Sequence, residues 1–146
     1  MEKIQSFYDL EQLVKKAVQN HIEDNREDIK EALDEYGEID GFFYEDEIRE
    51  ASQYIANDFV IYYSDTWQIC SVTRNGNMEE SQYFFDAQDQ VQGCHDGEDY
   101  MDKYMTSIAS LIVESLAMEF FSEFLLVEKL PFANPNKKLF DAIEAL

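Results

Sequence analysis

The sequence predicts a mainly α-helical, single-domain protein in which five to six helices pack around one long core helix in the C-terminal half. Apolar residues make up 45% of the 146 residues, which is enough for one hydrophobic core. Apolar side chains recur at three- and four-residue steps along most of the chain. No repeat or low-complexity linker divides it, and both prolines, Pro131 and Pro135, lie near the C-terminus.

The first predicted helix spans residues 7 to 23. Ser6 and Asp9 have the spacing of a capping box, and apolar residues then recur at helical spacing. A second, short helix fits "REDIKEALDEYG", residues 26 to 37, in which Gly37 is a typical left-handed stop.

The third predicted helix runs from about Glu45 to Phe59, because the acidic "EDE" favours the positive end of a helix dipole. The segment "VIYYSDTWQIC", residues 60 to 70, follows and contains a single acid. Ser64 is expected to cap a further short helix that ends before the turn "RNGN". Asp65 is then a helix-start residue rather than part of a binding surface.

Residues 78 to 97 fit a helix, a short strand or both in succession, and the helix is slightly favoured. The clearest helix begins near Gly97 and becomes apolar nearly all round in "LAMEFFSEFLLV". Such a pattern predicts a central core helix or part of a subunit interface. Pro131 ends this helix, and "NKKLFDAIEAL" fits one last short amphipathic helix.

Acidic residues are concentrated in two blocks. The chain has 32 Asp and Glu against 11 Lys and Arg, and its formal net charge is -21 at pH 7. Residues 23–50 hold thirteen acids and three bases, and residues 75–102 hold eight acids and no base, whereas ordinary surfaces intersperse both signs. The negative electrostatic field of these acids repels nucleic acid and anionic membranes, and it attracts basic surfaces such as the DNA-binding clefts of other proteins.

Motifs for catalysis, metal binding and membrane insertion do not stand out. Cys70 and Cys94 follow no metal or redox spacing, "DGEDYMD" does not match a calcium loop, and the N-terminus lacks an apolar core of signal-peptide length. The predicted core helix contains Glu114, Glu119 and Glu123, which disfavours a membrane span. We therefore expect a cytoplasmic, non-enzymatic protein with reduced thiols, no cofactor and no metal.

The acids of residues 23–50 can stand in for DNA phosphates. If this segment is helical, it presents roughly one carboxylate per 3 Å, close to the ~3.4 Å between phosphates along one DNA strand. The alternative is a solvated surface that keeps the protein soluble. Clustering with few bases favours binding, because self-repulsion destabilises a fold.

A family resemblance supports this interpretation. Residues 45 to 72 combine the acidic "YEDE", then Ile48 and Ala51 on a helix, then "VIYYSD" followed by "TWQIC". A long helix mixing acids with apolar residues over residues 98 to 128 is a second, weaker element. The pattern, over about two-fifths of the chain, resembles the small acidic antirestriction proteins of T-odd coliphages known as Ocr, which mimic bent duplex DNA. The chain is longer and lacks that family's strongly acidic C-terminal tail.

The resemblance implies an all-helical fold, a homodimer, and carboxylates presented like phosphates to the DNA cleft of a restriction or other defence enzyme. The candidate phosphate mimics are acids of the two blocks: Glu23, Asp24, Glu27, Asp28, Glu31, Asp34, Glu35, Glu38, Glu45, Asp46, Glu47, Asp86, Asp89, Asp96, Glu98, Asp99 and Asp102. The residues expected to support them as core or dimer contacts are Tyr62, Tyr63, Trp67, Ile69, Leu116 and Phe120.

The predicted function is therefore inhibition by DNA mimicry, in a protein from a phage or mobile element that binds no nucleic acid itself and acts in the cytoplasm of a bacterial host. The alternative is an acidic immunity protein or secretion chaperone that binds one basic toxin or effector. An acidic enzyme is a third candidate, although carboxylate pairs are too frequent in this sequence to identify a catalytic pair.

Overall fold

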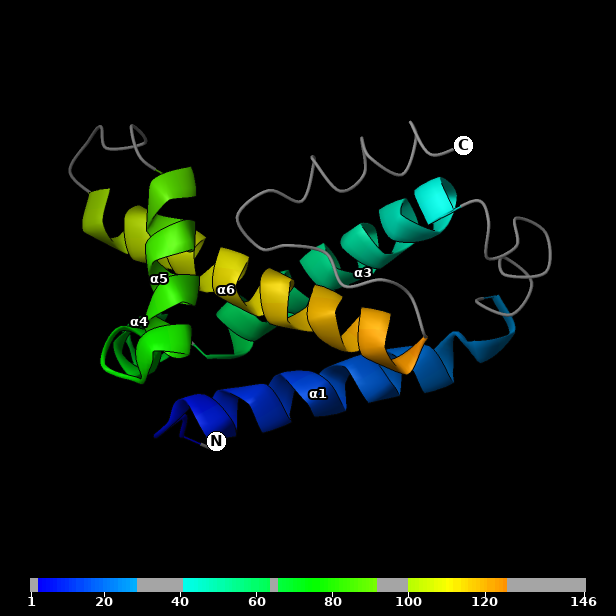
Figure 1. Ribbon diagram of the computed structural model, residues 1–146, viewed down its shortest axis with the longest axis horizontal. Coiled ribbons are helices and arrows are strands. Elements are labelled where there is room, and N and C mark those ends of the chain that lie inside the picture. Colours follow the sequence, from blue (N-terminus) through cyan, green and yellow to red (C-terminus); the bar gives the residue numbers. More distant parts are fainter. Residues whose placement is uncertain (1–2, 29–40, 64–65, 92–99, 126–146) are drawn as a thin grey trace.

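The computed structural model describes residues 3–28, 41–63, 66–91 and 100–125, which form a mainly α-helical fold (Figure 1). Its helices are α1 (Phe7–Asp24), α3 (Gly41–Tyr62), α4 (Thr66–Arg74), α5 (Met78–Gln90) and α6 (Tyr100–Phe124). The described residues contain no strand. The predicted fold class, a compact helical protein around a long helix in the C-terminal half, is confirmed.

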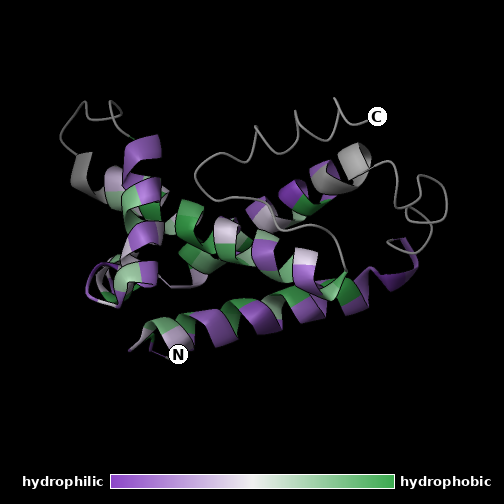
Figure 2. Ribbon diagram, viewed as in Figure 1, coloured by the Kyte–Doolittle hydropathy of each residue, from purple (hydrophilic) through white to green (hydrophobic). Residues whose placement is uncertain are grey.

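Helix α6 is the centre of this fold. It contacts each of the other four described helices and packs most extensively on α3, which it crosses in Figure 1. Ile108, Ile112, Leu116 and Phe121 on α6 are almost fully buried. Figure 2 shows green, hydrophobic bands along the coloured part of α6 with some hydrophilic bands between them, and green and purple alternating along α1. The all-round apolar sequence of α6 therefore reflects packing on several sides.

Part of α6 is also long and apolar enough to cross a membrane by length and composition. This stretch, Tyr104–Phe124, is 61% buried inside the protein over its most apolar window. The core helix of a soluble protein passes the same test. Packing against α1, α3, α4 and α5 accounts for its hydrophobicity within the fold.

The start of α1 follows the predicted signal with one difference. Ser6 Oγ accepts a hydrogen bond from the Asp9 backbone N–H at 3.1 Å, as in a capping box. The Asp9 carboxylate, however, accepts from the backbone N–H of Gln5 at 3.2 Å, one residue before the cap. Both bonds satisfy donors at the helix start, where a cap of this kind contributes about 1 kcal/mol.

Helix α3 is longer than predicted at both ends. It is already helical at Gly41, four residues before Glu45, and it continues through Tyr62 rather than ending at Phe59. The prediction was wrong at the start because a preference of acids for the first turn contributes only about 0.3–1 kcal/mol and does not exclude a further turn before them. It was wrong at the end because no glycine or proline interrupts "VIY".

Helix α5 settles the first part of the ambiguous segment. It is capped by Asn77, whose Oδ1 accepts from the Glu80 backbone N–H at 3.1 Å. The Glu80 carboxylate in turn accepts from the Asn77 backbone N–H at 2.6 Å, which completes a capping box. The helical preference for this segment is therefore confirmed as far as Gln90.

Several predictions concern residues outside the described ranges. Residues 26–28 are helical, in agreement with the start of the predicted second helix, but the rest of that helix is not described. The same applies to the capping roles of Ser64 and Asp65, to the end of the long helix at Pro131 and to the C-terminal helix.

The residues expected to form core or dimer contacts divide into two groups. Tyr63, Ile69 and Leu116 are buried, and Phe120 is half-buried. Tyr62 and Trp67 are 60% and 45% exposed, so the expectation of a core position is wrong for both. Successive helical residues lie about 100° apart, so the two neighbouring tyrosines point in different directions, and here Tyr63 is buried while Tyr62 is exposed. Trp67 lies off the buried face of α4, which is formed by Thr66, Ile69, Cys70 and Thr73.

Candidate functional site

The described phosphate-mimic candidates lie on four of the helices, α1, α3, α5 and α6, and in the segment after α1. Seven of them are exposed, namely Glu23, Asp24, Glu27, Asp28, Asp46, Glu47 and Asp89, and Asp86 on α5 is half-buried. Glu45 and Asp102 belong to α3 and α6, but their side chains are not described. Glu31, Asp34, Glu35, Glu38, Asp96, Glu98 and Asp99 lie outside the described residues.

The acids at the end of α1 are placed against the helix dipole. Glu23 and Asp24 occupy its last turn, where the partial negative charge of the helix disfavours a carboxylate. Among the described residues, the ion pair at this end joins Glu23 to Arg26 at 3.3 Å with both side chains exposed, a geometry that stabilises by about 1 kcal/mol at most. This arrangement does not favour folding.

A second exposed acidic stretch lies on α3. Asp46, Glu47 and Glu50 are all exposed. Arg49 approaches Asp46 only at the 4.0 Å limit of an ion pair, and the Arg49 side chain is mostly covered. The negative charge of this stretch therefore remains on its surface.

A third group of acids, which the sequence reasoning missed, meets where α1, α5 and α6 converge. We call it the acidic junction and define it as Glu11, Glu79, Glu80 and Glu119. The pKa of Glu11 is raised, first by partial burial and then by the negative charges of the other three residues. Such a meeting has no local signal, because it depends on how three helices far apart in sequence pack together.

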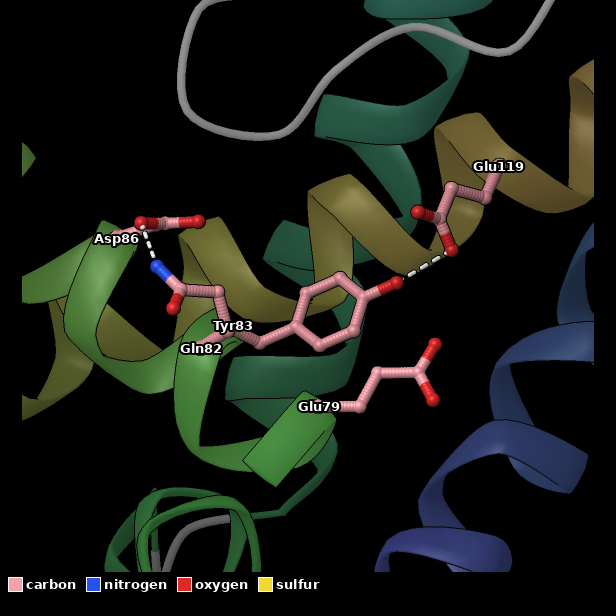
Figure 3. A pocket seen from close by; sticks show the side chains of 5 residues that line it. All are labelled: Glu79, Gln82, Tyr83, Asp86 and Glu119. Atoms are coloured by element: carbon pink, nitrogen blue, oxygen red, sulfur yellow. Dashed lines mark hydrogen bonds between the residues drawn. The ribbon is translucent and has the colours of Figure 1, made fainter. Parts of the chain in front are cut away.

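A small pocket of about 210 Å³ opens beside the junction, between α5 and α6. It is lined by Glu79, Gln82, Tyr83, Asp86 and Glu119. Figure 3 shows the Tyr83 ring between the Gln82 and Asp86 side chains on one side and Glu79 and Glu119 on the other. Asp86 is the one phosphate-mimic candidate that this pocket includes.

Tyr83 is held firmly in this pocket. Its hydroxyl donates to Glu119 Oε2 at 2.5 Å, and its ring stacks on Phe7 with the ring centroids 5.7 Å apart. Burial, followed by the hydrogen bond to Glu119, raises the pKa of Tyr83 well above its usual range. The phenol is therefore a fixed neutral donor that orients the Glu119 carboxylate.

A larger hollow of about 510 Å³ lies between α1 and α3 and has a different character. It is lined by Leu13, Lys16, Ala17, Asn20, Asp58, Phe59, Tyr62 and Tyr63. Both contributing segments are nearly neutral, because residues 1–22 hold three acids and three bases and residues 51–74 hold two acids and one base. This aromatic groove therefore lies on a part of the surface with little net charge.

The thiol of Cys70, on α4, is buried. Burial raises the pKa of the Cys70 thiol to about 12, and its Sγ donates to the Met105 carbonyl oxygen at 3.6 Å. A thiol with this pKa is a poor nucleophile at neutral pH. In the described part of the chain, no group of three or more His, Cys, Asp or Glu residues could hold a metal ion.

Comparison with protein-family models, curated proteins and solved structures finds no match to this chain. The resemblance to the Ocr proteins therefore stays a prediction. Any functional proposal depends on the placement of this chain's own charges and cavities.

The acidic junction predicts a specific dependence of stability on pH. The raised pKa of Glu11 means that the native state takes up this proton at a higher pH than the unfolded state, for which the reference value is 4.5. Stability should therefore rise as pH falls through the native pKa, and the gain should be complete below 4.5. We expect Glu11→Gln to raise Tm by about 1–3 °C at pH 7, and this difference should vanish near pH 4.5.

Thermal denaturation followed by circular dichroism at the two pH values measures this effect. Glu47→Gln is the matched control, because it removes one exposed carboxylate of α3 outside the junction. A gain in Tm at pH 7 that is as large for Glu47→Gln as for Glu11→Gln would contradict the assignment.

Proposed function

We propose that this protein is a non-enzymatic DNA mimic that inhibits a DNA-binding defence enzyme, restriction or similar, in the cytoplasm of a bacterial host. Its exposed carboxylates would occupy the basic cleft in which the enzyme binds DNA phosphates. The protein would itself bind neither nucleic acid nor membrane, since its field repels both.

The observation that carries this proposal is the placement of Glu23 and Asp24 in the last turn of α1, with Glu27 and Asp28 directly after them. A helix end is stabilised by basic residues such as His21 in the last turn of α1, yet Glu23 and Asp24 place two exposed acids in the same turn, with a single weak ion pair among the described residues. Because these two charges oppose the dipole of α1, their position supports a role in binding. The exposed acids of α3 extend the same kind of surface.

A basic cleft is the partner whose chemistry fits this surface best. Long-range attraction between opposite fields accelerates association and weakens as salt screens the charges. Several modest contacts distributed over a surface also fit a cleft built to bind many phosphates. One tightly fitted toxin or effector would instead depend on a few dominant residues.

The proposal is tested by competition with DNA. The immobilised protein is incubated with a bacterial lysate and then challenged with duplex DNA at about 50 and about 200 mM salt, a range over which phosphate-type contacts weaken steeply. We expect the recovered DNA-binding proteins to be released by DNA and to bind much more weakly at the higher salt. A recovered partner that DNA fails to displace at either salt would contradict mimicry and favour the immunity protein or chaperone alternative.

We also propose that the aromatic groove pairs two copies of the chain. Tyr62, which lines the groove, is 60% exposed, and Ile61, its neighbour in sequence, is 79% exposed. Exposed large apolar side chains are typical of an interface. Two highly acidic copies repel each other least through their nearly neutral segments. Sedimentation equilibrium should give the mass of two chains for the wild type and of one chain for Tyr62→Glu. A wild-type mass of one chain at micromolar concentration would exclude this pairing.

A further inference from the structure

The pocket between α5 and α6 has the size of a receptor for one side chain. Its volume of about 210 Å³ corresponds to roughly seven water molecules. Sites for drug-sized molecules usually enclose about 300–1,000 Å³. A single long side chain with a compact polar head fits this space better than a free metabolite does.

The lining of the pocket favours a positively charged ligand. Three of its five residues, Glu79, Asp86 and Glu119, carry carboxylates, and they come from two different helices. In the described part of the chain no base lies within ion-pair distance of Glu79 or Asp86, and residues 75–102 contain no Lys or Arg at all. The protein thus supplies negative charge here without a basic residue of its own from that segment.

Neighbouring groups strengthen the negative field at this place. Glu80 and the half-buried Glu11 lie close enough for their charges to act on each other, as the raised pKa of Glu11 shows. A cation that enters the pocket therefore gains from carboxylates beyond those that line it. Because no group of the described residues is suited to a metal ion, an organic cation is the better candidate.

The aromatic wall distinguishes a guanidinium from an ammonium group. Tyr83 is fixed by its bond to Glu119 at 2.5 Å and by stacking on Phe7, so the wall is already in place before a ligand enters. A planar guanidinium can pack against such a ring while its N–H groups reach carboxylates on either side. The ammonium of lysine lacks this planar fork.

We propose that this pocket receives one arginine side chain of the basic partner, with the guanidinium against the Tyr83 ring and between the carboxylates of Glu79 and Glu119. This inference rests on the proposed function, because the DNA cleft of the partner supplies the arginine. The pocket would add one specific contact to the many weak contacts of the exposed acids, and this contact would set the position of the partner on the protein.

The test compares arginine with lysine at equal charge. Fluorescein-labelled octa-arginine and octa-lysine peptides are titrated with the full-length protein, and binding is followed by fluorescence anisotropy. We expect octa-arginine to bind about five- to tenfold more tightly, in line with the extra contacts of a stacked guanidinium. Equal affinities of the wild type for the two peptides would overturn the proposal.

Two pocket variants and one control assign the preference to the pocket. The double variant Glu79→Gln with Asp86→Asn should abolish the preference for arginine. The single variant Glu79→Gln should do the same, and it leaves the hydrogen bond from Gln82 Nε2 to Asp86 Oδ1 in place because only the exposed Glu79 is changed. The control, Glu27→Gln with Asp28→Asn, removes two charges from exposed positions outside the pocket and should weaken the binding of both peptides equally. A preference that survives in the pocket variants would overturn the proposal.

Failure of this inference and failure of mimicry give different results. If the pocket variants keep the arginine preference while DNA still displaces the recovered partner, the pocket proposal fails and mimicry stands. If the preference depends on Glu79 while DNA displaces no partner, the pocket binds arginine and the proposed competition with DNA is wrong.

Discussion

Replacing Phe121 with alanine is expected to lower the free energy of unfolding by about 3–5 kcal/mol, as for other large buried aromatic residues. Phe121 is 2% exposed on the central helix α6 and makes a T-shaped contact with the His21 ring, with the ring centroids 5.6 Å apart. Domains are stable by only about 5–15 kcal/mol, and the self-repulsion of a chain with charge -21 lowers this margin. Urea denaturation followed by circular dichroism measures the loss.

Phe85→Ala is the matched control for this substitution. Phe85 lies on α5 and is 50% exposed, so the same chemical change there leaves a much smaller cavity. We expect it to lower the free energy of unfolding by less than about 1 kcal/mol. If Phe121→Ala were no more destabilising than Phe85→Ala, the assignment of α6 as the core helix would be wrong.

Changing Glu23, Asp24, Glu27 and Asp28 together to their amides is expected to weaken binding to the recovered partner by roughly fivefold to nearly a thousandfold. Each exposed contact contributes about 0.2–1 kcal/mol, so four of them sum to about 1–4 kcal/mol. Thermal stability should stay the same or rise, because two of the removed charges oppose the dipole of α1. Titration calorimetry with the purified partner and thermal denaturation of the free variant measure the two effects.

The single and double variants of this set should lose affinity in small cumulative steps. The variant Glu23→Asp with Glu27→Asp keeps the charge and serves as the control that should retain most of the affinity. Complete loss of binding after one of the four substitutions would contradict a distributed mimic, because it would indicate one dominant contact at this end of α1.

The sequence predicts those features of the fold that have a local cause. Ser6 caps α1 because the signal and its effect lie within three residues. The nearly continuous apolar sequence of α6 marks a core helix because a helix that is apolar all round must be buried. The ends of α3 were predicted less well, since weak local preferences compete there with the continuity of the helix. Tyr62 and Tyr63 are a similar case, because neither residue type nor spacing tells which of two adjacent aromatics is buried.

The candidate site likewise contains acids that the sequence identifies and acids that only the tertiary structure brings together. The exposed acids at the end of α1 and on α3 follow from charge counting along the chain. The acidic junction does not, because Glu11 and Glu119 are brought together only when α1 and α6 pack, and Glu79 joins them from α5. In the sequence alone, Glu119 is one of three acids that disfavour a membrane span. Its bond with Tyr83 requires the tertiary structure.

The central position of α6 also has a consequence for the newly made chain. The ribosome releases a protein from its N-terminus at about 5–20 residues per second, so α1, α3, α4 and α5 all emerge before the helix that each of them contacts. Until residues 100–124 follow, their apolar faces lack their main packing partner. The two acidic blocks precede α6 almost entirely, and mutual repulsion of their carboxylates keeps unfinished chains apart during that interval. We therefore expect the charge that we assign to binding to oppose aggregation of the nascent chain as well.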